Sequence, residues 1–242
     1  MIKRVTKAKT DKLGDRLRKG PVTDDDLRLL DVYRRSFGSA YETIVGTIRH
    51  TLSLEPTGRP AKSTTAIIDK LHRESIRLTQ IQDIAGCRLI VSDVAAQERV
   101  VESLKELFPK STVVDRRRRP SYGYRAIHVV VPIEDKSVEI QVRSELQHQW
   151  AELSEKLSDV IDPAIKYGAG DASALALLSE MTELIETVET IEANLGVIPS
   201  VFGEQQKQQI EGLRSQLTVA KQQVANLLQN NIAQLEGRRR NK

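Results

Sequence analysis

The sequence contains a single cysteine, Cys87, and no uninterrupted run of about 18 apolar residues. A lone cysteine cannot form an internal disulfide, and the absence of a Cys-x-x-Cys pair or a Cys/His cluster excludes a structural zinc site of the usual kind. The lysine-rich N-terminus has no apolar stretch of the kind found in secretory signals, so neither a signal nor a membrane span is predicted. We therefore expect a cytoplasmic protein in which Cys87 is a small core residue.

Several common catalytic motifs are also missing. There is no Gly-x-x-x-x-Gly-Lys-Ser/Thr loop, no Gly-x-Gly-x-x-Gly segment before a helix and no Gly-x-Ser-x-Gly elbow. These absences argue against the common NTPase, dehydrogenase and hydrolase schemes. The four histidines include no His-Asp pair of the sort used by metal-dependent phosphohydrolases. Any nucleotide site in this chain must be of another kind.

The charge is concentrated at the two ends of the chain, although the net charge is only +4. Residues 1–20 carry eight lysines and arginines, and residues 238–242 carry four more. Such runs attract nucleic acid, but flexible, solvated tails are the commoner outcome. We expect residues 1–22 to be a flexible basic segment and 238–242 to be a basic tail. With 242 residues and 39% hydrophobic residues, the rest of the chain can bury a core.

The hydrophobic pattern changes period along the chain. Apolar residues recur every three or four positions between Asp24 and Leu54, which predicts a helix capped by Thr23. A second helix is expected from Ser63 or Thr64 towards Arg77. Further helices are expected over residues 94–108, over 174–195 and in a glutamine-rich segment ending near 235, and strands over 87–91, 111–115, 124–133 and 137–143. This order predicts an α+β fold, a mixed sheet of four to five strands flanked by helices.

Polar residues alternate with apolar ones in the last of these strands. Glu139, Gln141 and Arg143 share one face of it because side chains alternate along a strand. Asp83 stands just before the first strand, where Gly86 lets a ligand or a neighbouring backbone come close. Two carboxylates of this kind, with phosphate oxygens and waters, are the usual means of holding Mg²⁺ on a nucleoside triphosphate. Taken alone, the strand favours an ordinary half-buried antiparallel strand whose polar face meets water, and Asp83 is equally consistent with a turn residue.

An arginine run joins a glycine flanked by tyrosines in residues 115–128. Guanidinium groups match phosphate bidentately, and a tyrosine ring can stack on a base. Because the run leads directly into a strand, we interpret it as a binding segment rather than a solvated loop.

Four segments carry a resemblance to a known family, in this order along the chain: Arg59-Pro60-Ala61-Lys62-Ser63, Asp83-Ile84-Ala85-Gly86-Cys87-Arg88, Gly123-Tyr124-Arg125-Ala126-Ile127-His128 and Val138-Glu139-Ile140-Gln141-Val142-Arg143-Ser144. They resemble the synthetase domain of the RelA/SpoT family, in particular its small stand-alone members. The resemblance implies a synthetase domain, which we place over residues 23–165 together with the N-terminal helix, whereas the hydrophobic pattern predicts the helical extension over 172–237. It also implies an ATP-dependent pyrophosphokinase.

The resemblance implies an ATP site built from the first two segments. Arg59 and Arg88 are similar to the pair that sandwiches the adenine, a suitable use of flat cationic groups. Lys62, Ser63 and Lys70 are similar to residues that face the triphosphate.

The resemblance also implies the catalytic and acceptor residues. Asp83 resembles the Mg²⁺ ligand, and Glu139 resembles the carboxylate that contacts the metal region and takes the proton of the attacking 3′-hydroxyl. Gln141 is similar to the neighbour that supports Glu139. Tyr124 resembles the ring that stacks on the acceptor base, with His128 nearby.

One departure concerns the acceptor. Members that make alarmones commonly have a lysine in the segment before Gly123, where this chain has Arg119-Pro120-Ser121-Tyr122. We expect Arg117, Arg118 or Arg119 to replace it, with Arg125 also on the acceptor side.

Three functions follow as hypotheses. The first is synthesis of guanosine tetra- or pentaphosphate from ATP and GDP or GTP. The second is a toxin that pyrophosphorylates the 3′-CCA end of tRNA, which the missing lysine and basic tails favour and which would imply an antitoxin. The third is an inactive nucleotide- or RNA-binding module, against which Asp83 and Glu139 argue. A homo-oligomer built on the terminal helices is a further hypothesis.

Overall fold

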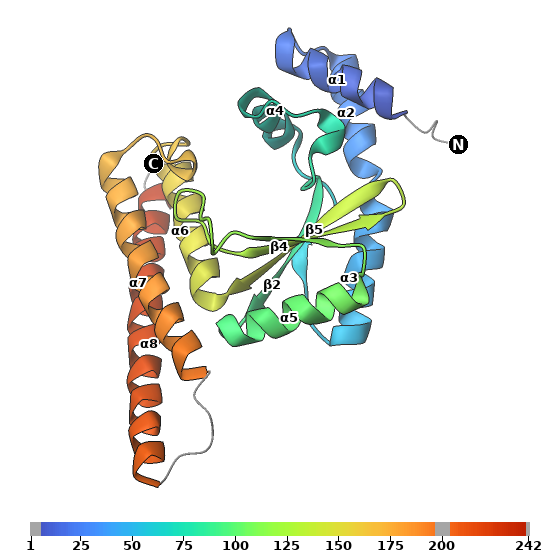
Figure 1. Ribbon diagram of the computed structural model, residues 1–242. Coiled ribbons are helices and arrows are strands. Elements are labelled where there is room, and N and C mark those ends of the chain that lie inside the picture. Colours follow the sequence, from blue (N-terminus) through green and yellow to red (C-terminus); the bar gives the residue numbers. More distant parts are fainter. Residues whose placement is uncertain (1–5, 197–203, 241–242) are drawn as a thin grey trace. The chain divides into compact units, whose positions relative to one another are not determined.

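The computed structural model describes residues 6–196 and 204–240 and confirms an α+β fold, a mixed five-stranded sheet flanked by helices (Figure 1). The strands are β1 (Thr57–Arg59), β2 (Ala85–Val91), β3 (Thr112–Asp115), β4 (Ile127–Ile133) and β5 (Lys136–Ser144). The α-helices are α1 (Lys7–Lys19), α2 (Asp24–Arg35), α3 (Gly38–Leu52), α4 (Thr64–Arg73), α5 (Val94–Leu107), α6 (Glu145–Val160), α7 (Ala172–Gly196) and α8 (Glu204–Arg240). Two short 3₁₀ helices are η1 (Leu78–Gln80) and η2 (Ile165–Tyr167).

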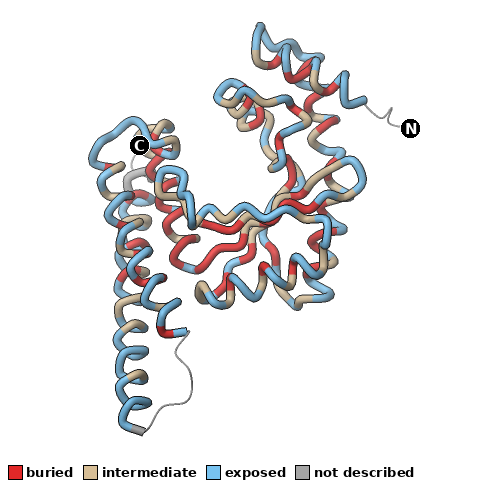
Figure 2. Tube along the Cα trace, in the orientation of Figure 1, coloured by how far each residue is buried: buried red, intermediate tan, exposed pale blue. Residues whose placement is uncertain are grey.

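The strand order in the sheet is β1-β2-β5-β4-β3. Strand β1 runs antiparallel to β2, with Arg59 opposite Gly86 and Thr57 opposite Arg88. Strand β1 was not predicted, because its three residues are all exposed and lack an apolar pattern. Tertiary pairing with β2 creates it. Figure 2 shows that the central strands are largely buried.

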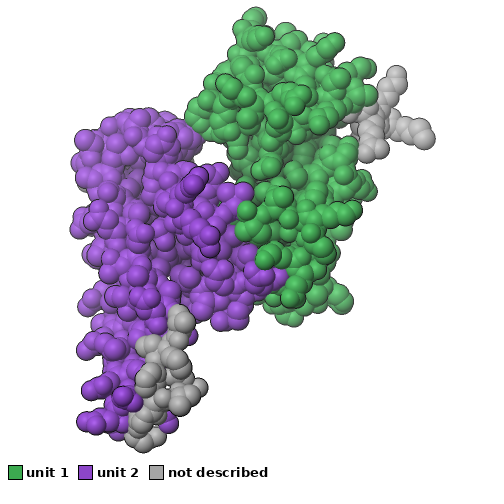
Figure 3. Space-filling model, viewed as in Figure 1, with its two compact units in different colours: residues 1–89, 103–113, 128–141 green, residues 90–102, 114–127, 142–242 purple. Residues whose placement is uncertain are grey.

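The chain divides into two compact units (Figure 3). Unit 1 comprises residues 1–89, 103–113 and 128–141, and unit 2 comprises residues 90–102, 114–127 and 142–242. Each unit is assembled from several stretches of the chain, so its core depends on contacts between residues that are distant in sequence.

The expectation that residues 1–22 form a flexible segment was wrong for residues 7–19, which form α1. Thr6 caps this helix, and its apolar residues Leu13 and Leu17 are almost fully buried. The helix packs closely on η1: a Cβ atom added at Gly14 would lie only 2.8 Å from Cβ of Leu78, so glycine is what permits this approach. The burial of this apolar face outweighs the tendency of the basic residues to keep the segment in water.

The single helix predicted between Asp24 and Leu54 is in fact two helices, α2 and α3. The Ser36 hydroxyl donates to the Tyr33 carbonyl at 2.6 Å, and such a bond competes with helical hydrogen bonds. Phe37 is buried and packs edge-to-face on Tyr33, with ring centroids 5.3 Å apart. The apolar spacing continues across the break, which is why the sequence pattern does not reveal it.

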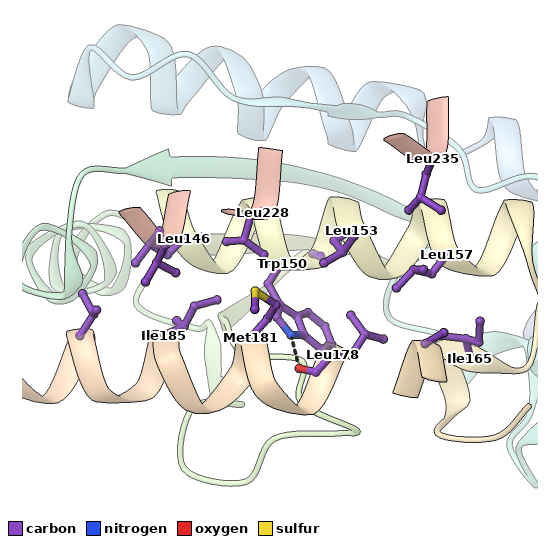
Figure 4. Packing of buried hydrophobic residues seen from close by; sticks show 14 residues of the cluster. Leu146, Trp150, Leu153, Leu157, Ile165, Leu178, Met181, Ile185, Leu228 and Leu235 are labelled. Carbon is purple, nitrogen blue, oxygen red and sulfur yellow. Dashed lines mark hydrogen bonds between the residues drawn. The ribbon is translucent and has the colours of Figure 1, made fainter. Parts of the chain in front are cut away.

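Helices α6, α7 and α8 pack against one another within unit 2 (Figures 1 and 4). Their shared core contains Trp150 of α6, whose indole nitrogen donates to the Leu178 carbonyl of α7 at 3.1 Å. Helix α6 was not predicted, although Ser144 and Gln147 form a capping box at its start. The predicted helical extension is therefore folded against α6, and a homo-oligomer built on the terminal helices stays a hypothesis.

Two expectations concern segments at the edge of what the structure describes. The connection between the two long predicted helices includes residues 197–203, which lie outside the described residues. Helix α8 continues to Arg240, and the last two residues of the expected basic tail also lie outside them. Within the described ranges, the helices contain no segment long and apolar enough to cross a membrane.

Candidate active site

Strand β5 presents Glu139 and Gln141 on one face, as the alternation predicts. Val138, Ile140 and Val142 are fully buried on the other face. The Glu139 side chain keeps only 12% of its surface exposed. The apolar face of β5 therefore anchors the strand, and this rigid element fixes the position of the carboxylate.

Two neighbours hold the Glu139 carboxylate. Nδ1 of His128, on β4, lies 3.0 Å from one Glu139 oxygen, and Nε2 of Gln141 donates to the other at 2.7 Å. Burial opposes ionisation of Glu139, as does the negative charge of Asp83, but the hydrogen bond and charge of His128 and the Gln141 amide outweigh both. The pKa of Glu139 is therefore lowered, and its carboxylate is ionised at neutral pH.

Asp83 lies between two lysines. Its oxygens accept hydrogen bonds from Nζ of Lys62 at 2.5 Å and from Nζ of Lys70 at 3.0 Å. Burial opposes ionisation of Asp83, but the two ammonium charges and their hydrogen bonds lower its pKa to about 2. The three side chains are largely buried, with 13 to 21% of their surface exposed. Two lysines and one aspartate give this cluster a net positive charge, which suits an anionic ligand.

The segment between β1 and α4 positions Lys62 and Ser63. The Lys62 amide donates to the Ile84 carbonyl at 2.6 Å, and the Arg34 guanidinium of α2 donates to the Lys62 carbonyl at 3.0 Å. The Ser63 hydroxyl caps α4 by accepting from the Ala66 amide. Amides at a helix start favour phosphate groups. The sequence did not reveal Arg34, because its partner is 28 residues away.

Arg59 and Arg88 lie on the same face of the β1–β2 pair. Arg88 is opposite Thr57, so Arg59 is its diagonal neighbour, and such neighbours are separated by about 7–8 Å. A flat base in van der Waals contact with a cation on each side needs roughly 7 Å between them. A Cβ atom at Gly86 would lie 3.7 Å from Glu139 Cβ, so this face of the sheet also carries Glu139.

The arginine run lies in unit 2; Arg118 reaches Asp115 at 3.4 Å with an exposed side chain, and two other members are nearly buried and bound within the chain. Arg117 contacts Asp115 at 2.8 Å and Glu98 at 2.5 Å, and Arg125 contacts Glu186 and Glu189 at 3.3 and 3.2 Å. The side chains of both arginines are only 11% exposed.

Other residues that the sequence assigned to the acceptor, Arg118, Arg119 and Tyr124, are exposed or half-buried. The Arg118 side chain is 85% exposed and Arg119 is also exposed. The Tyr124 hydroxyl accepts from Nη2 of Arg143 at 3.0 Å, and this guanidinium lies 5.1 Å from the centre of the Tyr124 ring. Arg143 was not foreseen as the partner of Tyr124. The acceptor roles of this set stay predictions.

Comparison with known families gives a direct result for the centre of the chain. Residues 58–158 match the family described as a region found in RelA / SpoT proteins. This segment belongs to the RelA/SpoT family. The RelA/SpoT segment contains every predicted site residue described above.

Relatives of known sequence match about half of this chain. An uncharacterised protein of Mycobacterium tuberculosis is 35% identical over 111 residues, which are 44% of this chain and 41% of the relative. A probable chloroplastic GTP diphosphokinase of Oryza sativa is 30% identical over 127 residues, 51% of this chain and 16% of the relative. The chain thus spans about two fifths of the length of the first of these relatives.

The similarity to solved structures extends over more of this chain than residues 58–158. The small alarmone synthetase 1 from Bacillus subtilis is 25% identical with a TM-score of 0.53, over 72% of this chain and 96% of that chain. A GTP pyrophosphokinase family protein from Streptococcus pneumoniae has a TM-score of 0.52 at 22% identity, over 72% and 93% of the two chains. The second likeness concerns the fold alone.

The RelA/SpoT segment offers few protein ligands for a metal. Among the described residues, no group of three or more His, Cys, Asp or Glu side chains could hold a metal ion. Asp83 and Glu139 are near enough for the charge of Asp83 to act on the pKa of Glu139. One or two carboxylates fit Mg²⁺, which takes its other ligands from water and substrate phosphates.

Proposed function

We propose that this chain transfers the β,γ-pyrophosphate of ATP to the 3′-hydroxyl of GDP or GTP. The observation that carries the proposal is the Glu139 carboxylate, which is held ionised by His128 and Gln141 on a rigid strand. A transferase that activates a hydroxyl needs such a base at a fixed position.

The donor side of the proposal rests on the Asp83 cluster and the arginine pair. Lys62, just before the start of α4, and Lys70, in the last turn of α4, supply two cations that meet at Asp83, and such a pair suits a triphosphate. The diagonal spacing of Arg59 and Arg88 suits an adenine ring between them. Asp83 and Glu139 would hold Mg²⁺, which when bound would neutralise charge on the phosphate oxygens.

The chemistry is a balanced group transfer. The acceptor hydroxyl gives its proton to the Glu139 carboxylate, and its oxygen forms a bond to the β-phosphorus of ATP. The bond from that phosphorus to the oxygen bridging the α-phosphate breaks, and AMP leaves with the electron pair. Gln141 and His128 hold the carboxylate in place during the transfer, so catalysis depends on positioning and electrostatics rather than on a covalent intermediate.

The rice relative, which is named as a probable GTP diphosphokinase and is 30% identical over 127 residues, supports a guanine nucleotide as acceptor. Arg118 and Arg119 are the candidates for its phosphates because their side chains are exposed, whereas those of Arg117 and Arg125 are nearly buried in ion pairs within the chain.

Transfer of a labelled group tests the proposal. The purified chain is incubated with Mg²⁺ and ATP labelled at the γ-phosphate, with GDP, GTP or deacylated tRNA offered separately, and the Glu139→Gln variant is assayed in parallel. Label on GDP or GTP with the unsubstituted chain alone supports the proposal. Label only on tRNA would replace it with the tRNA hypothesis, and no label on any acceptor would refute it in favour of a binding module.

A further inference from the structure

Helix α7 buries a carboxylate that the proposed chemistry does not use. Glu189 is only 5% exposed and lies beyond the RelA/SpoT segment. One of its oxygens accepts from the Ser144 hydroxyl at 3.0 Å and from Nε2 of Gln147 at 2.6 Å. Ser144 and Gln147 are the capping box of α6, so Glu189 ties α7 to the start of α6.

The other oxygen of Glu189 faces the arginine run. It lies 3.3 Å from Nε and 3.2 Å from Nη2 of Arg125. Nη1 of Arg125 in turn donates to the Arg117 carbonyl at 3.2 Å. A buried charge is retained only when it is paired and hydrogen-bonded, so the positions of Glu189 and Arg125 depend on each other.

A second path leads from Glu189 to Arg117. The Gln147 side chain accepts from Nε2 of Gln97 at 2.8 Å, and Oε1 of Gln97 accepts from Nη1 of Arg117 at 3.1 Å. Gln97 and Gln147 are fully buried. The network thus holds both ends of the segment 117–125, while Arg118, Arg119 and Tyr122 between them are exposed.

We propose that Glu189 is a positioning residue that fixes the segment 117–125 for binding the acceptor nucleotide. Helix α7 thereby contributes to acceptor affinity without touching the acceptor. That the segment 117–125 binds the acceptor rests on the proposed function, whereas its attachment to α7 through Glu189 does not. The structure supplies a matched control, because Glu186 of the same helix contacts Arg125 at a similar distance, 3.3 Å, but its side chain is 59% exposed. An exposed ion pair contributes little, whereas a buried one constrains its partners.

The test compares Glu189→Gln with Glu186→Gln in the full chain. Glu189→Gln is expected to raise the KM for the acceptor by about tenfold and to leave the KM for ATP within about twofold. Glu186→Gln is expected to leave both KM values within about twofold. Loss of general stability would raise neither KM selectively, so the split between the two substrates separates positioning from folding. Equal KM values for the acceptor in both variants would overturn the proposal.

A readout without activity separates this inference from the proposed function. Hydrogen exchange of the amides of residues 116–126 should be faster by about tenfold in Glu189→Gln than in Glu186→Gln, even if the chain transfers nothing to a guanine nucleotide. Unchanged exchange would refute the positioning role while leaving pyrophosphate transfer intact.

A double variant covers the case in which Glu189→Gln does not fold. Arg125→Gln together with Glu189→Gln buries no unpaired charge. If Glu189 acts through Arg125, this double variant and Arg125→Gln should have the same acceptor KM. A higher KM in the double variant would contradict that route.

Discussion

Replacing Asp83 by asparagine removes the carboxylate that holds Lys62 and Lys70 together. In the structure, Asp83 accepts a hydrogen bond from each lysine, at 2.5 and 3.0 Å, and only 21% of its side chain is exposed. An asparagine has the same shape but no charge, so it leaves two neighbouring ammonium groups to repel each other. The variant therefore tests whether this cluster stabilises the folded chain.

The magnitude follows from the pKa of Asp83. The folded chain lowers this pKa from 3.8 to about 2. At about 1.4 kcal/mol per unit of pKa, the carboxylate contributes about 2–3 kcal/mol to the free energy of unfolding at neutral pH. A lowered pKa means that this contribution is complete above the unfolded value and is lost as the pH falls through the folded value. The difference between the two proteins should be constant from about pH 5 to 8 and shrink below about pH 4.

Urea unfolding followed by far-UV circular dichroism measures the difference at several pH values. Asp69→Asn is the control, because Asp69 precedes Lys70 on α4 but is exposed. We expect it to change the free energy of unfolding by less than about 0.5 kcal/mol. Stability of Asp83→Asn equal to that of the unsubstituted chain at pH 7 would refute the electrostatic reasoning. A difference that persists undiminished at about pH 3 would show that the effect is steric.

Four further predictions concern catalysis, its pH dependence, acceptor binding and backbone geometry. Glu139→Gln should abolish transfer while leaving the Kd for ATP within about twofold, because it removes the base and keeps the shape; transfer at the unsubstituted rate would exclude Glu139 as the base. Because the pKa of Glu139 is lowered, its ionisation should not limit the rate at neutral pH, and a pH–rate profile controlled by Glu139 near pH 7 would contradict this. Tyr124→Ala should weaken acceptor binding by about 1–3 kcal/mol if a base stacks there, and calorimetry that finds unchanged affinity would leave Tyr124 with a packing role. Gly123→Ala should lower the free energy of unfolding by about 1–3 kcal/mol. Gly123 has φ of +86°, and a Cβ atom there would lie 2.8 Å from the Trp150 ring. A thermal unfolding midpoint equal to that of the unsubstituted chain would show that the backbone and the ring adapt to the added methyl group.

The sequence by itself predicted the parts of the candidate active site that depend on local pattern. The alternation of Val138, Glu139 and Ile140 depends only on the twofold repeat of a strand, and it was confirmed. Ser63 at the start of α4 and Cys87 in the core were predicted from equally local signals. The α+β class followed from the order of these periodic segments.

The tertiary structure decided which of these residues meet. The bond from Lys62 to Asp83 joins residues 21 apart, and that from Ser144 to Glu189 joins residues 45 apart. No periodicity encodes such distances, because they depend on how the elements pack. The same reason explains the ordered α1, the strand β1 and the internal pairing of Arg117 and Arg125. Local sequence supplies the chemical groups, whereas burial of distant apolar faces determines which groups lie together.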